Sequence, residues 1–274
     1  MPLLLALASS LMWGIADFVG GLASKRTPAM VVVGISQFVG LVIIAAIGIV
    51  GGFNWNPSAV SWAIASGVSG FIGLNFFYRA LATGRMGIVS PIASLGALVP
   101  LTAGLLAGDQ PSSLQLIGVV CAIVGIVLAS GPELTGGADF KPVLFAVGAA
   151  CGFGFCLWTI SVGSSYSVIT TMTLMRVVSV LIAIVSLTIA RTRIDARTLD
   201  WRLIVTAGAF DVLANVTFGL ATTGDLLSLV SVLGSLYPVA TVLLAWAILK
   251  ERLQFVQYVG VAAALAGVAA IAGG

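Results

Sequence analysis

Long apolar stretches follow one another along almost the whole chain, and each is about as long as a membrane-crossing helix. Such a helix needs about 20 mostly apolar residues. Ten stretches qualify, separated by short segments rich in glycine, proline and charge. Their approximate bounds are 3–22, 29–50, 59–82, 87–107, 113–130, 142–161, 167–190, 201–222, 226–248 and 254–272. We therefore expect an all-α integral membrane protein with ten transmembrane helices.

The small number of charged residues excludes an ordinary soluble domain. Charged residues make up 8% of the chain and hydrophobic residues 60%, whereas soluble domains carry about 25% charged residues. The net charge of +3 is spread over loops and forms no patch, so we expect no nucleic-acid partner. The chain has no histidine, and its three cysteines lie in apolar runs without metal-ligand spacing. We expect neither a metal site nor a cofactor.

One heptapeptide occurs in two nearly identical copies. Residues 94–100 read SLGALVP and residues 232–238 read VLGSLYP, so the pattern L-G-x-L-x-P recurs at an offset of 138. Other landmarks recur at an offset of 140, namely Asn75 with Asn215, Gly84 with Gly224, and Trp13-Gly14 with Phe153-Gly154. The pattern predicts an internal duplication.

The duplication divides the chain into two halves. We expect a first five-helix repeat at 1–130, a connecting loop at 131–141 and a second five-helix repeat at 142–274. Because each repeat has an odd number of spans, the second enters the membrane from the opposite side, and the repeats are inverted. Inverted repeats are typical of secondary transporters, whose substrate site lies near the middle of the membrane between the repeats.

Basic residues are confined to alternate loops, and this bias predicts an orientation. Eleven of the twelve lysines and arginines lie in or beside the odd-numbered loops: Lys25, Arg26, Arg79, Arg85, Lys141, Arg191, Arg193, Arg197, Arg202, Lys250 and Arg252. Because cytoplasmic loops are enriched in lysine and arginine, this places the odd-numbered loops in the cytoplasm and both termini outside.

Three segments resemble the EamA-type carriers of the drug/metabolite transporter superfamily. They are SLMWGIADFVGG at 10–21, with the opening W-G motif, and the stretches 77–118 and 220–260. The resemblance covers essentially the whole chain. It implies ten helices in two inverted halves, a central cavity and alternating access, in the cell (inner) membrane of what we expect to be a bacterium. It also implies cytoplasmic termini, as in the family's amino-acid exporters, against the orientation that the charges favour.

Ionisable residues in the middle of apolar helices are candidate functional residues because such charges are costly in a membrane. Arg176 and Asp211 lie at similar depth in adjacent spans, and an ion pair between them is sterically plausible. This pair would either line a cavity or hold the second half together. Gln37 corresponds to Arg176 in the first half, Asn215 follows Asp211 by one helical turn, and Asn75 is the counterpart of Asn215. We predict that these residues line the cavity.

Asp17 lies within the first span, where it either carries a coupling proton or pairs with Lys25 or Arg26 near the interface. Asp17 and Asp211 are the proton-coupling candidates, since the chain has no histidine. Five aromatic residues are predicted to line the cavity and stack on substrate: Trp13, Tyr78, Phe153, Trp158 and Tyr237. Three prolines are predicted to act as hinges, because proline removes a backbone hydrogen bond: Pro91, Pro100 and Pro238.

The chain lacks the G-x-x-x-x-G-K-[ST] motif and any histidine-based catalytic group, so we expect no ATPase and no enzyme. The leading hypothesis is a monomeric secondary transporter that exports amino-acid-like metabolites or amphiphiles by alternating access, with membrane lipid around it and protons as a candidate coupling ion. Alternatives are a sugar uptake carrier, a lipid-group flippase of the same fold and, more remotely, an intramembrane enzyme.

Overall fold

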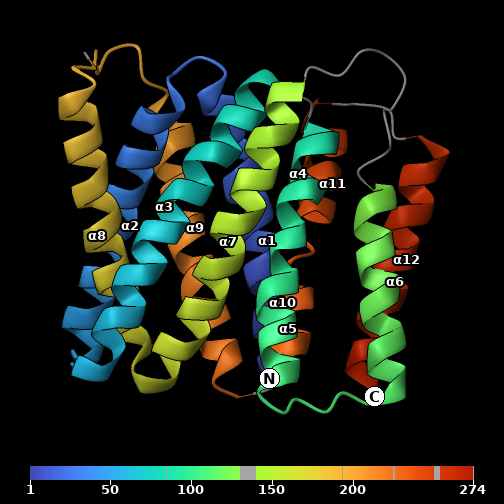
Figure 1. The fold of residues 1–274 in the computed structure, drawn as a ribbon. Helices are drawn as coiled ribbons and strands as arrows, with labels where there is room; N and C mark the ends of the chain where they lie inside the picture. The colour runs from blue at the N-terminus through green and yellow to red at the C-terminus, as the bar shows by residue number, and fades with distance from the viewer. Residues whose placement is uncertain (85, 130–139, 193, 225, 250–253, 274) are drawn as a thin grey trace.

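The computed structural model describes residues 1–84, 86–129, 140–192, 194–224, 226–249 and 254–273. In these ranges the regular structure is helical throughout, and the helices run roughly parallel to one another (Figure 1). The elements are α1 (Pro2–Ser24), α2 (Ala29–Gly51), η1 (Pro57–Ala59), α3 (Val60–Thr83), α4 (Met86–Ser94), η2 (Leu95–Ala97), α5 (Leu98–Leu106), α6 (Ser113–Ala129), α7 (Phe140–Tyr166), α8 (Val168–Ile189), α9 (Trp201–Thr222), α10 (Leu227–Gly234), α11 (Tyr237–Leu249) and α12 (Phe255–Gly273).

Seven helical stretches of the described chain are long and apolar enough to cross a membrane. They are Pro2–Ser24, Ala29–Gly51, Pro57–Thr83, Phe140–Tyr166, Val168–Ile189, Trp201–Thr222 and Leu227–Ile248. Ile92–Leu106, Ser113–Leu128 and Phe255–Ile271 are shorter apolar helices. Many large apolar side chains on the outer surface are exposed, among them Val50, Leu106 and Ile189. Because such a surface suits lipid rather than water, the chain is an integral membrane protein.

Two of the expected spans are interrupted, and both interruptions fall in the repeated L-G-x-L-x-P pattern. In the first copy the 3-10 segment η2 separates α4 from α5, and in the second copy Ser235 and Leu236 separate α10 from α11. Pro100 and Pro238 lie in the first turn after each break, where a missing backbone N–H is tolerated. Pro91 lies inside helix α4, and its role as a hinge stays a prediction.

The helices form a bundle with one pair set to its side. Close neighbours are α1 with α9, α3 with α7, and α2 with both α8 and α9. Helices α6 and α12 pack mainly on each other, at the right-hand edge of the bundle in Figure 1. Glycine permits a close crossing of α3 and α7, since a Cβ at Gly152 of α7 would lie 2.6 Å from Cα of Gly73 in α3.

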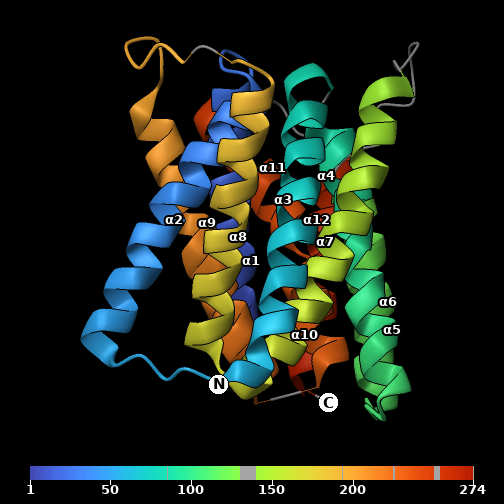
Figure 2. The same cartoon turned by 60° about the vertical axis from the view of Figure 1, so that its left-hand side comes forward.

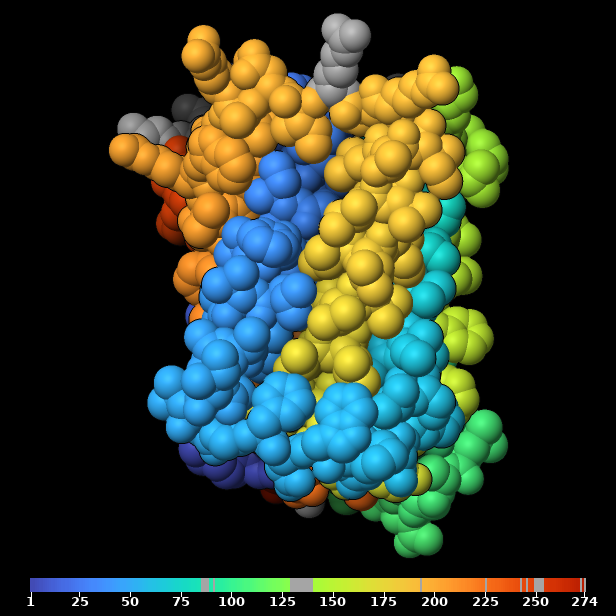
Figure 3. All heavy atoms as spheres, turned by 90° about the vertical axis from the view of Figure 1, so that its left-hand side faces the viewer, coloured from blue at the N-terminus to red at the C-terminus, as the bar shows by residue number. Residues whose placement is uncertain are grey.

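The two ends of the bundle differ in charge. Both termini lie at the lower end in Figure 1, whereas the α1–α2 and α8–α9 connections lie at the opposite end, as the two turned views also show (Figures 1, 2 and 3). Those two connections carry exposed basic residues, including Lys25, Arg26, Arg191 and Arg197. Arg85, Arg193, Lys250 and Arg252 lie outside the described residues.

The predicted connecting loop, 131–141, lies largely outside the described residues, and its last two positions already belong to a helix. Helix α7 begins at Phe140, so Phe140 and Lys141 form its first turn. The domain boundaries at 130 and 142 stay predictions.

Candidate functional site

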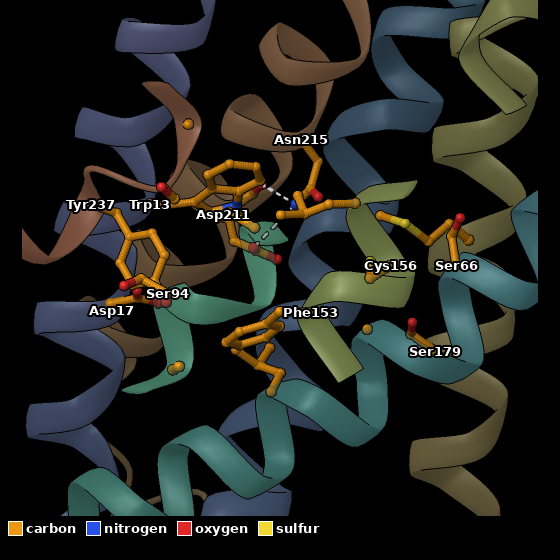
Figure 4. A pocket seen from close by; sticks show the side chains of 18 of the residues that line it. Trp13, Asp17, Ser66, Ser94, Phe153, Cys156, Ser179, Asp211, Asn215 and Tyr237 are labelled. Carbon is orange, nitrogen blue, oxygen red and sulfur yellow. Dashed lines mark hydrogen bonds between the residues drawn. The ribbon is translucent and has the colours of Figure 1, made fainter. Parts of the chain in front are cut away.

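A cavity lies inside the bundle, between helices from both halves of the chain (Figure 4). Its volume is about 700 Å³ when its open mouth is included. Helices α1, α2, α3, α4, α7, α8, α9 and α11 contribute side chains to its lining. Eight of the residues singled out from the sequence line it: Trp13, Asp17, Gln37, Phe153, Arg176, Asp211, Asn215 and Tyr237.

The predicted ion pair between Arg176 and Asp211 is present. Nη1 of Arg176 lies 2.7 Å from Oδ2 of Asp211, and the exposed fractions of the side chains are 2% and 14%. Arg176 Nη1 also donates to Oε1 of Gln37, and Gln37 Nε2 donates to the same Asp211 oxygen at 3.1 Å. Helices α8, α9 and α2 are thus tied together by one charge-assisted network.

Asn215 completes this network from one turn further along α9. Its Nδ2 donates to Oδ1 of Asp211 at 3.1 Å and to the backbone oxygen of Asp211 at 2.6 Å. Both carboxylate oxygens of Asp211 therefore have donors inside the protein. We call Gln37, Arg176, Asp211 and Asn215 the paired cluster. Its local charge is balanced, because one guanidinium faces one carboxylate.

Part of the Arg176 guanidinium is buried without a partner. Nε and Nη2 are buried and donate to no acceptor in the described chain. Nε faces α2, where a Cβ built on Gly40 would lie 3.3 Å from it. Glycine at this position lets the arginine side chain pass close to the helix backbone. Only the Nη1 edge, already bound to Gln37 and Asp211, takes part in the network.

The opposite side of the cavity has polar groups without partners. The Asp17 side chain, on α1, is 6% exposed and forms no hydrogen bond or ion pair with any residue that the structure describes. Lys25 and Arg26, the alternative partners suggested by the sequence, are exposed and form no ion pair with it. The hydroxyl of Tyr237 is buried and also lacks a partner in the described chain. We call Asp17 and Tyr237 the unpaired side (Figure 4).

Aromatic rings flank the unpaired side and are held from behind by buried rings. Trp13 packs on Phe218 with ring centroids 5.5 Å apart. Phe153 and Tyr237 both contact the fully buried ring of Phe77, with centroids 5.5 Å and 6.4 Å apart and nearly perpendicular planes in the second pair. Phe77 was not singled out from the sequence, because one phenylalanine in an apolar helix carries no distinguishing pattern.

Three residues predicted to line the cavity are not among its lining residues. Asn75 is buried within α3 and donates to the backbone oxygen of Phe71 at 3.0 Å. Tyr78 is buried against α1, where its hydroxyl faces the backbone oxygen of Ala16 at 3.5 Å. Trp158 packs edge-on against Trp62 and Phe155. The structure places these three residues outside the lining of this cavity, because depth in the membrane does not determine which way a helix face points.

Sequence reasoning also missed polar lining residues of small size. Ser66 of α3 donates to Thr159 of α7 at 2.8 Å, and Ser179 of α8 donates to the backbone oxygen of Gly67 at 3.1 Å. Both serines bond to neighbouring helices and line the cavity. Serines in membrane helices usually bond the preceding turn, so neither stood out.

The sequence model of the EamA-like transporter family matches two stretches of the chain, residues 1–131 and 140–273. The chain belongs to the EamA-like transporter family. Members of this family belong to the drug/metabolite transporter superfamily. The membership suggests a membrane transporter of that type.

Two further similarities to known proteins name no function. A protein of Methanocaldococcus jannaschii described as uncharacterized is 36% identical over 72 residues, which are 26% of this chain. The chain spans about half of that relative's length, 53%. A protein of solved crystal structure aligns with a TM-score of 0.77 at 17% identity, covering 98% of this chain and 95% of that one. At this identity the likeness shows the fold alone.

Proposed function

We propose that this EamA-like transporter is a secondary carrier that exports small organic metabolites by alternating access, with amino-acid-like compounds and amphiphiles as candidate substrates. The observation that carries the proposal is the cavity, which holds two carboxylates, a guanidinium and three aromatic rings inside a bundle of apolar helices. Buried charges in a membrane protein mark substrate or ion pathways. The lining combines groups that bind a charged end with rings that bind an apolar body.

Alternating access is supported by the way in which helix contacts repeat. If α1, α2, α3, α4/α5 and α6 correspond to α7, α8, α9, α10/α11 and α12, the main helix contacts of one half have counterparts in the other. The packing of α1 on α9 matches α7 on α3, and that of α2 on α9 matches α8 on α3. The two family matches cover the same two halves. We take these matching contacts as support for ten spans in two inverted five-helix repeats.

The described basic residues at the end opposite the termini support the orientation that the positive-inside rule predicts. We propose that this end faces the cytoplasm of a bacterial cell and that both termini face outward. Family analogy gives the reverse orientation. Attaching a reporter that works only in the cytoplasm to the α8–α9 loop distinguishes them, since the proposed orientation predicts activity there.

We further propose that transport is coupled to protons through Asp17 and Asp211, because both are carboxylates that line the cavity. The carrier acts as a monomer in this proposal, since one chain supplies a cavity with lining from both halves.

The decisive experiment is transport by the purified protein in proteoliposomes, with radiolabelled amino acids, amines, sugars and a fluorescent lipid offered in turn. We expect substrate movement of one small-molecule class, and its loss in Asp211→Asn protein that inserts normally. Movement of the lipid alone would replace the proposal with a flippase, and movement of sugar alone with a sugar carrier. Full activity of Asp211→Asn would remove this carboxylate from the transport mechanism.

A further inference from the structure

The charged residues that line the cavity do not balance. They are Asp17, Arg176 and Asp211. Arg176 and Asp211 neutralise each other across 2.7 Å. Asp17 is therefore the ionisable group that has no counterpart within the described lining. The ionised form of a buried carboxylate without a partner is energetically costly, and a ligand with a positive charge would compensate for it.

The guanidinium is not available to an anionic ligand in this arrangement. Nη1 of Arg176 is occupied by Gln37 and Asp211. Nε and Nη2 are buried, with Nε against Gly40 of α2. A carboxylate in the cavity would meet Asp17 and Asp211 without gaining a free cationic partner. The lining therefore disfavours an anion, and gives the carboxylate of a zwitterion no compensating contact.

The surroundings of Asp17 suit an organic cation better than a metal ion. Trp13 precedes Asp17 by four residues, so the two side chains lie on the same face of α1. Phe153 of α7 and Tyr237 of α11 add rings from other helices. Cations are attracted to the faces of aromatic rings, whereas small hard cations require several oxygen ligands. In the described chain no group of three His, Cys, Asp or Glu residues is arranged to hold a metal.

We propose that Asp17, flanked by Trp13, Phe153 and Tyr237, binds the ammonium group of the transported compound, and that the substrates are organic monocations with an apolar or aromatic body. This inference rests on the proposed carrier function and narrows its substrate class. Phe77, which contacts both Phe153 and Tyr237, acts as a positioning residue for two of the rings.

A series of compounds with one ring and different charge tests the proposal. Titration calorimetry on the purified protein would compare 2-phenylethylamine, its trimethylammonium analogue, phenylalanine and 3-phenylpropanoate. We expect both cations to bind at least about tenfold more tightly than the zwitterion and the anion, because both can pair with the Asp17 carboxylate and lie against the ring faces, whereas the carboxylates of the other two compounds would find no cationic partner. Asp17→Asn should raise the Kd of 2-phenylethylamine at least about tenfold, because its ammonium would lose the charged hydrogen-bond acceptor. Asp17→Glu should retain most of the affinity.

Asp195→Asn is the matched control, because it removes an exposed carboxylate in the α8–α9 loop. We expect it to bind the cations as the wild type does. Unchanged binding in Asp17→Asn would overturn the role of Asp17, and tighter binding of phenylalanine or 3-phenylpropanoate, or no binding of either cation, would overturn the substrate class. If Asp17→Asn does not fold, the order of affinities in the wild type still decides.

Proteoliposome transport separates this inference from the function on which it rests. Asp17-dependent binding of the cations without their movement across the membrane would uphold the ammonium site and contradict the carrier. Transport that does not depend on Asp17 would uphold the carrier and overturn the site.

Discussion

The two sides of the cavity differ in whether their buried polar groups have partners. In the paired cluster every carboxylate oxygen of Asp211 has a donor, from Arg176, Gln37 or Asn215. On the unpaired side Asp17 and the Tyr237 hydroxyl have none in the described chain. Asp17 is 6% exposed and the Asp211 side chain 14%, so contact with water does not explain why Asp17 lacks a partner.

This difference assigns separate tasks to the two carboxylates. A satisfied network in a low-dielectric interior rigidifies the elements that it joins, and the paired cluster joins α2, α8 and α9. An unsatisfied group is instead available to a ligand. We therefore expect changes in the paired cluster to affect stability first, and changes on the unpaired side to affect binding first.

The largest effect is expected when the paired cluster loses its only cation. Arg176→Met keeps much of the side-chain volume but leaves the Asp211 carboxylate in the membrane interior without its guanidinium. Breaking a buried ion pair in this way costs about 3–5 kcal/mol. We expect a strongly lowered thermal unfolding midpoint in detergent, measured by the fluorescence of the tryptophans.

The control for this prediction removes both charges. In Arg176→Met/Asp211→Leu no isolated charge remains in the paired cluster, so most of the lost stability should return. An unchanged midpoint in Arg176→Met, or a double variant as unstable as the single one, would show that the ion pair does not hold these helices together.

A smaller effect is expected from Asn215→Ala, with Asn75→Ala as its matched control. Asn215 donates to the Asp211 carboxylate at 3.1 Å, and hydrogen bonds to charged groups contribute about 1.5–3 kcal/mol. Asn75 donates only to the backbone oxygen of Phe71 at 3.0 Å, and its own side-chain oxygen has no partner in the described chain. The thermal midpoint should therefore fall further in Asn215→Ala. Equal losses would mean that the carboxylate contact adds no stability.

The paired cluster was largely predictable from the sequence, because charges are conspicuous in apolar helices. Arg176 and Asp211 lie at similar depth in adjacent spans, and Asn215 follows at a helical spacing. Helix positions were predictable for the same reason, since the length of an apolar run sets the length of a span. The repeated proline pattern coincides with interruptions of the fourth and ninth expected spans. The α-helix is interrupted at Leu95–Ala97 and at 235–236, just before Pro100 and Pro238.

The rotation of each helix about its axis was not predictable. In a membrane protein the lipid-facing and the buried faces are both apolar, so the amphipathic pattern that orients a soluble helix is weak. Tyr78 and Trp158 therefore looked as suitable for the cavity as Tyr237 and Trp13, yet they pack elsewhere. The sequence left open whether Asp17 pairs with Lys25 or Arg26. Contacts among helices distant in the sequence were needed to show that it does not.

The smallest effect is expected on the unpaired side, from Tyr237→Phe. The buried Tyr237 hydroxyl has no partner among the described residues, so removing it should leave the free energy of unfolding unchanged or raise it by up to about 1 kcal/mol. The control is Tyr78→Phe. The Tyr78 hydroxyl faces the Ala16 carbonyl at 3.5 Å, so its removal should lower the free energy of unfolding by at most about a few tenths of a kcal/mol. Thermal midpoints and the Kd of 2-phenylethylamine would be measured on both variants.

Thermal midpoints and affinities together show whether the ring or the hydroxyl of Tyr237 contacts the ligand. Phenylalanine retains the ring that faces a cation, so Tyr237→Phe should keep the affinity for 2-phenylethylamine within about threefold, well below the tenfold that corresponds to 1.4 kcal/mol. A large loss of affinity with unchanged stability would assign the hydroxyl itself to the ligand. A large loss of stability would show that Tyr237 belongs with the paired groups, and the contrast between the two sides of the cavity would then rest on Asp17 alone.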